Sequence, residues 1–185
     1  MDDDLPYTMT LSPATEPIDE FVTKLSGNPV WLEAPQWPVC VRHDRPMAFI
    51  GQFRLPGREP CMAYLFMSER CEGSWDPEAG ENALIVQPGR LPPFIQILRG
   101  FTGPDGVHGD VHVDLDEVDP KCLKPWESRV LGQPEWLQSE EFPPGAWSFF
   151  FQLNESDCTC ANFGGGVGYG FLSADKLEGR FLWQC

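Results

Sequence analysis

The feature that most constrains this chain of 185 residues is a set of three short sequences that occurs twice in the same order. The first is Gly-x-Pro-x-Trp-Leu, the second is an aromatic segment with a glutamine near its end, and the third is Tyr-x-Phe-x-Ser. Three matches in one order indicate an internal duplication. The pairs lie at 27–32 and 132–137, at 49–53 and 149–153, and at 64–68 and 169–173, with offsets of 105, 100 and 105 residues.

The duplication sets the expected domain organisation. A chain of this length forms one domain by default, so we predict a single compact domain over residues 1–185. It would consist of two pseudo-equivalent halves, at about 20–70 and 125–175, joined by a central link at about 88–125. Each half would contain a turn that carries a tryptophan, followed by two strands.

Short apolar segments bounded by glycine or proline predict the strands. The chain contains 19 proline and 18 glycine residues, which favours short elements joined by turns over long helices. We therefore predict a mainly β or β-rich α+β fold with few short helices. The predicted strands are 47–53, 61–68, 82–88, 94–100, 111–115, 145–153, 167–173 and 180–184.

One segment has the pattern of a helix. Residues 15–25 begin with Thr15, a good N-cap, and Pro17 suits the first helical turn. Their apolar residues follow helical spacing, which predicts a short helix over 15–25. These apolar residues are Ile18, Phe21, Val22 and Leu25. We expect loops at 116–126, with room for a helical turn, and at 155–166.

The repeated tryptophans and glutamines are the first candidate site. A turn with glycine and proline is rigid and can deliver a large aromatic ring to a core. A glutamine within an apolar strand must be hydrogen-bonded when it is buried. These residues either hold each half together or line one binding groove between the halves, and the sequence leaves both interpretations open. They are Trp31, Gln52, Trp136 and Gln152.

A second candidate is the alternating segment 107–116. As a strand it would place two histidines and three aspartates on one face, because side chains alternate. They are His108, Asp110, His112, Asp114 and Asp116. Such a face is either a solvated surface, a site for a divalent metal, or the acid–base centre of a metal-dependent hydrolase. Same-face neighbours lie about 6.5–7 Å apart, so a second strand would have to help bind one ion.

The cysteines offer a weaker metal candidate. Cys40 and His43 have the two-residue gap of half a zinc site, and Cys158 and Cys160 could supply two more ligands. The alternative is a structural role for all four.

The glycine-rich segment 164–170 lacks the order of a phosphate-binding loop. No serine, cysteine or threonine stands in a known nucleophile motif, so the sequence gives no positive case for an enzyme.

The net charge of −15 and the pI of about 4.4 narrow the expected partners. A phosphate backbone would be repelled, so nucleic acid is excluded, whereas a basic protein or peptide would be attracted. The first residues do not resemble a signal peptide, and no apolar run approaches the ~20 residues that span a bilayer. We therefore predict no membrane association, a cytoplasmic location and reduced thiols.

Several of these motifs resemble the YwqG-like family, an uncharacterised and mostly bacterial family. Residues 24–52 carry Gly-x-Pro-x-Trp, Pro-x-Cys, Pro-Met and Phe-x-x-Gln in that order, and 151–173 and 181–185 resemble later family motifs. The chain departs from the family at 164–166, which has no acidic residue, and at His43, where many members have cysteine. The first half also resembles, over a short segment, the N-terminal region of programmed cell death protein 2, which implies a binding module.

These observations favour a non-enzymatic, cytoplasmic protein-interaction module. The acidic charge, the repeated aromatic residues and the lack of catalytic motifs support it, and the resemblance to YwqG-like proteins implies no established activity. A metal-binding protein or metal-dependent hydrolase that uses His108, Asp110, His112 and Asp114 is the alternative. A further alternative is an immunity-type inhibitor of a basic toxin.

Overall fold

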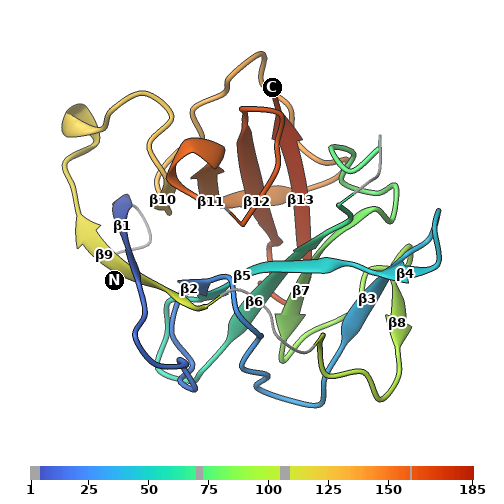
Figure 1. Cartoon of the computed structure of the whole chain (residues 1–185). Coiled ribbons are helices and arrows are strands. Elements are labelled where there is room, and N and C mark those ends of the chain that lie inside the picture. The colour runs from blue at the N-terminus through green and yellow to red at the C-terminus, as the bar shows by residue number, and fades with distance from the viewer. Residues whose placement is uncertain (1–4, 70–72, 105–108, 159) are drawn as a thin grey trace.

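The computed structural model describes residues 5–69, 73–104, 109–158 and 160–185, and it consists almost entirely of β-structure (Figure 1). Ten strands form one antiparallel sheet, which confirms the predicted mainly β fold. The strands lie in the order β13 (Gly179–Gln184), β12 (Val167–Ser173), β11 (Trp147–Asn154), β10 (Arg129–Val130), β1 (Tyr7–Pro13), β9 (Val111–Glu117), β2 (Lys24–Leu25), β5 (Ala48–Arg54), β6 (Met62–Met67) and β7 (Asn82–Gln87).

A second, smaller sheet and two short turns complete the secondary structure. The small sheet has the order β4 (Arg45–Pro46), β3 (Trp37–Cys40) and β8 (Gln96–Leu98). The turns are the 3-10 elements η1 (Pro120–Cys122) and η2 (Glu155–Asp157). Each of the eight predicted strands is present, with ends that differ by at most two residues. The helical turn expected within 116–126 is also present.

The helix predicted over 15–25 is wrong. Lys24 and Leu25 form strand β2, which pairs with β5 on one side and β9 on the other. Upstream, the N–H of Ile18 donates to Oδ2 of Asp110 at 2.6 Å. A helix of this length is marginal on its own. The backbone of this segment instead bonds to Asp110 and to strands β5 and β9, and a helix would lose these bonds.

The large sheet is nearly closed, because its two edge strands β7 and β13 lie side by side (Figure 1). The segments that extend these strands also meet, since the N–H of Arg90 donates to the carbonyl of Leu177 at 2.7 Å. Gly179 sits so near β7 that a Cβ there would lie 2.5 Å from the carbonyl oxygen of Leu84. Glycine at this position therefore permits the edges to approach.

From here on, the first half means the segment with strands β1–β8 (residues 5–104), and the second half means the segment with strands β9–β13 (residues 109–185). Each half pairs its first strand with the other half. In register, Tyr7 and Thr8 of β1 face Val130 and Arg129 of β10. In the same way, Val111 and His112 of β9 face Leu25 and Lys24 of β2. The central part of the sheet is completed by pairing of β1 with β9. Strand β9, which the sequence analysis placed in the central link, therefore has the place in the second half that β1 has in the first.

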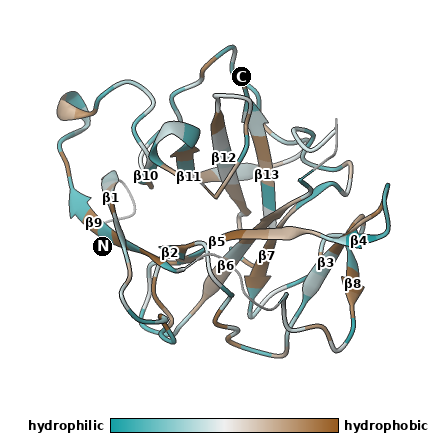
Figure 2. Cartoon of the chain, viewed as in Figure 1, coloured by the Kyte–Doolittle hydropathy of each residue, from teal (hydrophilic) through white to brown (hydrophobic). Residues whose placement is uncertain are grey.

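Three hydrophobic clusters cover the two faces of the sheet. The largest lies inside the nearly closed sheet and includes residues of both halves, among them Leu65 and Phe151. Each half has a second cluster on its outer face, around Tyr64 in the first half and Tyr169 in the second. Strands β6 and β12 are therefore buried on both faces. On β9 the polar residues His112, Asp114 and Asp116 are exposed, and the end of this strand is coloured as hydrophilic in Figure 2.

Candidate functional site

The tryptophan turn of the first half is held by buried side chains of the sheet. Oε1 of Gln52 accepts from the N–H of Val30 at 2.8 Å, and its Nε2 donates to the carbonyl of Val22 at 2.9 Å. The hydroxyl of Tyr64 donates to the carbonyl of Val30 at 2.8 Å. The ring of Trp31 packs on Tyr64 with centroids 4.7 Å apart. These contacts fix the turn against the outer face of the sheet.

The second half repeats these contacts. Oε1 of Gln152 accepts from the N–H of Glu135 at 3.0 Å, and its Nε2 donates to the carbonyl of Glu127 at 2.9 Å. The hydroxyl of Tyr169 donates to the carbonyl of Glu135 at 2.9 Å. Trp136 packs on Tyr169 with centroids 4.7 Å apart. The geometry of the two turns is therefore the same.

A further glutamine in each half, which the sequence analysis did not single out, holds the residues just after the turn. Gln87 accepts from the N–H of Glu33 at 3.0 Å. Gln184 accepts from the N–H of Gln138 at 3.0 Å. Like the two repeated glutamines, both lie at or near the end of an apolar strand sequence. This shared position could have identified Gln87 and Gln184 as buried residues that bind a turn.

The four residues proposed for a groove between the halves do not share one surface. Gln52 and Gln152 are fully buried. Trp31 belongs to the outer cluster of the first half, and Trp136 to that of the second. Their hydrogen bonds and ring contacts are directed to their own turns. The observed role is the first of the two interpretations, in which each set holds its half together.

The proposed metal face is divided by the fold. His108 lies outside the described residues. His112 and Asp114 are exposed on the outer face of β9, while Val113 between them packs toward the interior cluster. Asp110 precedes the strand and pairs with Lys24. Within residues 5–69, 73–104, 109–158 and 160–185, no group of three or more His, Cys, Asp or Glu residues is arranged to hold a metal ion.

The partner of Asp110 was missed by the sequence analysis. Nζ of Lys24 lies 2.8 Å from Oδ1 of Asp110, and the two side chains are only 2% and 7% exposed. Nζ also donates to the carbonyl of Ile18 at 3.1 Å. A pocket of about 480 Å³ opens over this pair, between segments 14–19 and 27–30. The available signal was a lysine inside the apolar sequence that precedes Gly27.

The second half has its own buried cation at the equivalent position. Arg129 faces Gln152 across the sheet, as Lys24 faces Gln52. Its Nη2 donates to the carbonyl of Gln133 at 2.9 Å. Burial lowers the pKa of the Arg129 guanidinium below its usual value, and the nearby carboxylate of Glu135 acts in the opposite direction. Both cations therefore serve to hold local backbone.

The four residues proposed as zinc ligands, all of them within the described residues, do not come together as one site. Sγ of Cys40 lies 3.6 Å from Nδ1 of His43, and Cys40 belongs to the outer cluster of the first half. Cys158 and Cys160 form a disulfide at the interior cluster, which corrects the expectation of reduced thiols for these two residues. The Cα atoms of Cys158 and Cys160 lie 5.5 Å apart, within the usual range for a disulfide. A disulfide pair is not a zinc ligand set.

A hollow between the two halves carries exposed aromatic residues. It has a volume of about 410 Å³ and lies between segment 75–79 of the first half and residues 141–144 of the second. Trp75 is 46% exposed and Phe142 is 44% exposed. Phe142 packs edge-on against Trp136 with centroids 5.3 Å apart. The rim also contains the carboxylates of Asp76, Glu78 and Glu141.

The walls of this hollow are fixed by hydrogen bonds. Arg180 of β13 donates to Glu78 at 3.1 Å, and its guanidinium carbon lies 4.4 Å from the ring centroid of Trp147. These contacts attach segment 75–79 to the second half. Oδ1 of Asp76 accepts from the N–H of Glu78 at 2.8 Å. Oε2 of Glu141 accepts from Nε2 of Gln184 at 3.1 Å. Arg180 balances Glu78, so Asp76 and Glu141 make the hollow negative.

Comparison with known proteins gives no relative that could extend these observations. The chain matches no known protein family, and no curated protein sequence and no solved structure is significantly similar to it. Within the described residues, no helix has the length and apolar character needed to cross a membrane.

Proposed function

We propose that this chain is a non-enzymatic protein-interaction module that binds a basic segment of a partner protein in the hollow between the halves. The observation that carries the proposal is the pair of exposed rings, Trp75 and Phe142, beside the carboxylates of Asp76 and Glu141. A lysine or arginine over an aromatic face is attracted by the ring, and nearby carboxylates strengthen the attraction. The hollow thus suits a cationic side chain.

The charge of the whole chain supports a basic partner. A net charge of −15 attracts cations over long distances and raises the rate at which they arrive. Arginine is the better guest, because its planar guanidinium can stack on Trp75 while it donates to a carboxylate. The same structure already contains this arrangement internally, since Arg180 stacks on Trp147 and pairs with Glu178 at 2.7 Å.

The kind of residues in the hollow supports binding to a protein surface. Exposed aromatic residues in concave sites supply much of the energy at protein interfaces. The hydrogen bonds made by Asp76 and Glu141 hold the carboxylates in place before a partner arrives. A site that is ordered in advance loses less entropy on binding.

We also propose that the two halves arose by internal duplication and that the chain is related to the YwqG-like proteins. The repeated bonds of Gln52 and Gln152, and of Tyr64 and Tyr169, support the duplication. The order of the sequence motifs supports the relationship. Neither proposal is needed for the binding site, because segments 75–79 and 141–144 lie outside the repeated motifs.

The test uses a soluble peptide of glycine and serine that carries three arginines, with isothermal titration and tryptophan fluorescence as readouts. The matched peptide carries citrulline, which has the same shape without the charge. We expect the arginine peptide to bind at least about tenfold more tightly, a difference of about 1.4 kcal/mol. The affinity should fall as salt is raised, since exposed charges are screened.

Substitutions locate the binding. Trp75→Ala, Phe142→Ala and the double change Asp76→Asn with Glu141→Gln should each weaken binding of the arginine peptide at least about fivefold. The control is Phe21→Ala, because Phe21 is 37% exposed and does not line the hollow. Equal binding of the arginine and citrulline peptides, or unchanged binding by the Trp75 variant, would refute the proposal.

A further inference from the structure

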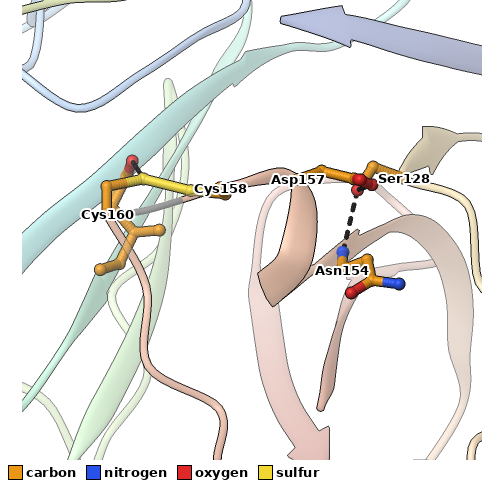
Figure 3. Close-up of a disulfide and its surroundings, with 6 residues drawn as sticks. Ser128, Asn154, Asp157, Cys158 and Cys160 are labelled. Atoms are coloured by element: carbon orange, nitrogen blue, oxygen red, sulfur yellow. Dashed lines mark hydrogen bonds between the residues drawn. A yellow bond between two sulfur atoms is a disulfide. The ribbon is translucent and has the colours of Figure 1, made fainter. Parts of the chain in front are cut away.

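A disulfide lies in a connection whose length differs between the two halves. Strands β5 and β6 are joined by residues 55–61, whereas the equivalent strands β11 and β12 are joined by the longer segment 155–166. The additional length carries Cys158 and Cys160, which are bonded to each other (Figure 3). The shorter connection ends at Cys61, which is a free thiol. Among the described cysteines, this disulfide is formed by residues of the second half.

The disulfide lines a pocket. The pocket has a volume of about 410 Å³ and is bounded by the end of β1, the start of β9 and the disulfide loop. Cys158 is buried, with 3% of its surface exposed, and belongs to the interior cluster. Cys160 is only partly buried. Both cysteines line the pocket, and Cys160 is the more exposed of the two.

We propose that Cys158 and Cys160 form a reversible thiol–disulfide exchange site whose co-reactant is a low-molecular-weight thiol of the glutathione class. The pocket beside Cys160 admits this thiol. The proposal goes beyond peptide binding, because the pocket of the disulfide and the hollow of Trp75 share no lining residue.

The reduced form has a place for both thiols. Sγ of Cys160 lies 3.4 Å from the carbonyl oxygen of Ile50, so the reduced thiol can donate to that oxygen. Cys158 would remain in the interior cluster, where a free cysteine behaves as a small hydrophobic residue. The two sulfur atoms therefore stay close to each other in the reduced form, and the disulfide between them can form again.

The fold does not depend on the disulfide. The bond spans two positions along the chain, and a cross-link that closes so short a loop removes little entropy from the unfolded chain. The loop is also anchored by Glu155, whose carboxylate accepts from the N–H groups of Phe163 and Gly165. Near the disulfide, Ser128 donates to Asp157 at 2.7 Å (Figure 3). Reduction therefore leaves the loop attached at both ends.

The exchange proceeds in two balanced steps. The thiolate of the small thiol attacks Sγ of Cys160, the Cys158–Cys160 bond breaks, and Cys158 leaves as a thiolate that takes a proton. A second small thiol then attacks the sulfur of the bound one. The products are the reduced Cys160 thiol and one molecule of the oxidised, dimeric small thiol, so two electrons pass to the protein.

The test places the folded protein in mixtures of reduced and oxidised glutathione, followed by acid quenching, alkylation and mass spectrometry. We expect the alkylated fraction of Cys158 and Cys160 to rise from near zero to complete as the mixture becomes more reducing, and to return when oxidised glutathione is added. Circular dichroism should not change. Cys61, whose thiol pKa is raised by burial, serves as the internal control with constant labelling.

Two variants identify the attacked sulfur. With Cys158→Ser the accessible Cys160 should form a mixed disulfide with glutathione about tenfold faster than the buried Cys158 does in Cys160→Ser. Equal rates would overturn the assignment of Cys160. Two results for the unchanged protein would overturn the proposal: absence of the bond in oxidised glutathione, or a bond that is reduced only after unfolding in guanidinium.

Discussion

Tyr64 and Tyr169 make the same two hydrogen bonds in the two halves of the molecule. The hydroxyl of Tyr64 accepts from the N–H of Leu32 at 2.8 Å and donates to the carbonyl of Val30 at 2.8 Å. The hydroxyl of Tyr169 bonds in the same way to Leu137 and Glu135, at 2.9 Å each. One buried phenol thus fastens each tryptophan turn to the sheet, and this relationship supports the first prediction.

Tyr64→Phe and Tyr169→Phe should each destabilise the protein by about 1–3 kcal/mol, because each change leaves a backbone N–H and a carbonyl without their partner. Chemical denaturation monitored by circular dichroism measures the loss. The two effects should add in the double variant, since the tyrosines lie in separate clusters. A loss below about 0.5 kcal/mol for either variant would contradict this role.

Stability should decline at alkaline pH. Burial raises the pKa of Tyr64 and that of Tyr169 to about 12, compared with 10.0 for an exposed tyrosine. Above pH 10 the unfolded chain releases these protons while the folded chain retains them, so the free energy of unfolding falls as pH rises from 10 to 12. Denaturant titrations at several pH values test this. The slope should be smaller in the double phenylalanine variant, and an unchanged slope would exclude these tyrosines as its source.

The buried pair of Lys24 and Asp110 should be sensitive to loss of either partner. Asp110→Asn leaves the Lys24 ammonium buried without its counter-charge, which costs about 3–5 kcal/mol. The matched control is Asp175→Asn, because Asp175 and Arg90 form an ion pair at 2.7 Å with both side chains about half exposed. That change should cost less than about 1 kcal/mol. If the two changes had equal effects on the denaturation midpoint, the buried pair would have no special role.

Gly27 and Gly100 allow a contact effect to be separated from a backbone effect. Both have a positive φ, 68° and 75°, so alanine is strained by a similar amount at either position. A Cβ at Gly27 would overlap the carboxylate of Asp110, while a Cβ at Gly100 would have no neighbour within 4 Å among the described atoms. Gly27→Ala should therefore lower the melting temperature well beyond Gly100→Ala. Equal shifts would show that only backbone strain matters.

The strands could be predicted because their signals are local. In β9 the alternation of His112, Val113 and Asp114 places polar side chains outside and valine toward the interior, as the pattern indicates. The repeated Gly-x-Pro-x-Trp turns were also visible, because their residues are adjacent. Their role in holding each half was one of two interpretations, and the choice between them required the partners of Gln52 and Gln152.

The predicted helix failed because its periodicity competed with partners that are distant in sequence. Ile18 and Leu25 are buried, as the apolar stripe requires, but Leu25 is buried as part of strand β2 and the interior cluster. The N–H of Ile18 bonds to Asp110, 92 residues away. A sequence window of eleven residues contains no information about such a partner.

The hollow between Trp75 and Phe142 was not predicted for the same reason. Each aromatic residue is flanked by proline and acidic residues, which indicates an exposed turn and nothing more. The approach of β7 to β13 brings the two turns together, and Arg180 then ties Glu78 to the second half.

The sequence by itself determined the β-rich class, the position of most strands and the repeated turns, because side-chain alternation and turn chemistry act between neighbouring residues. Only the tertiary structure decided which charges are paired and which surfaces remain open. Lys24 and Asp110 are 86 residues apart, and each could have been a surface charge. The pairing of β9 with β2 brings them together, and burial of both charges then makes each depend on the other.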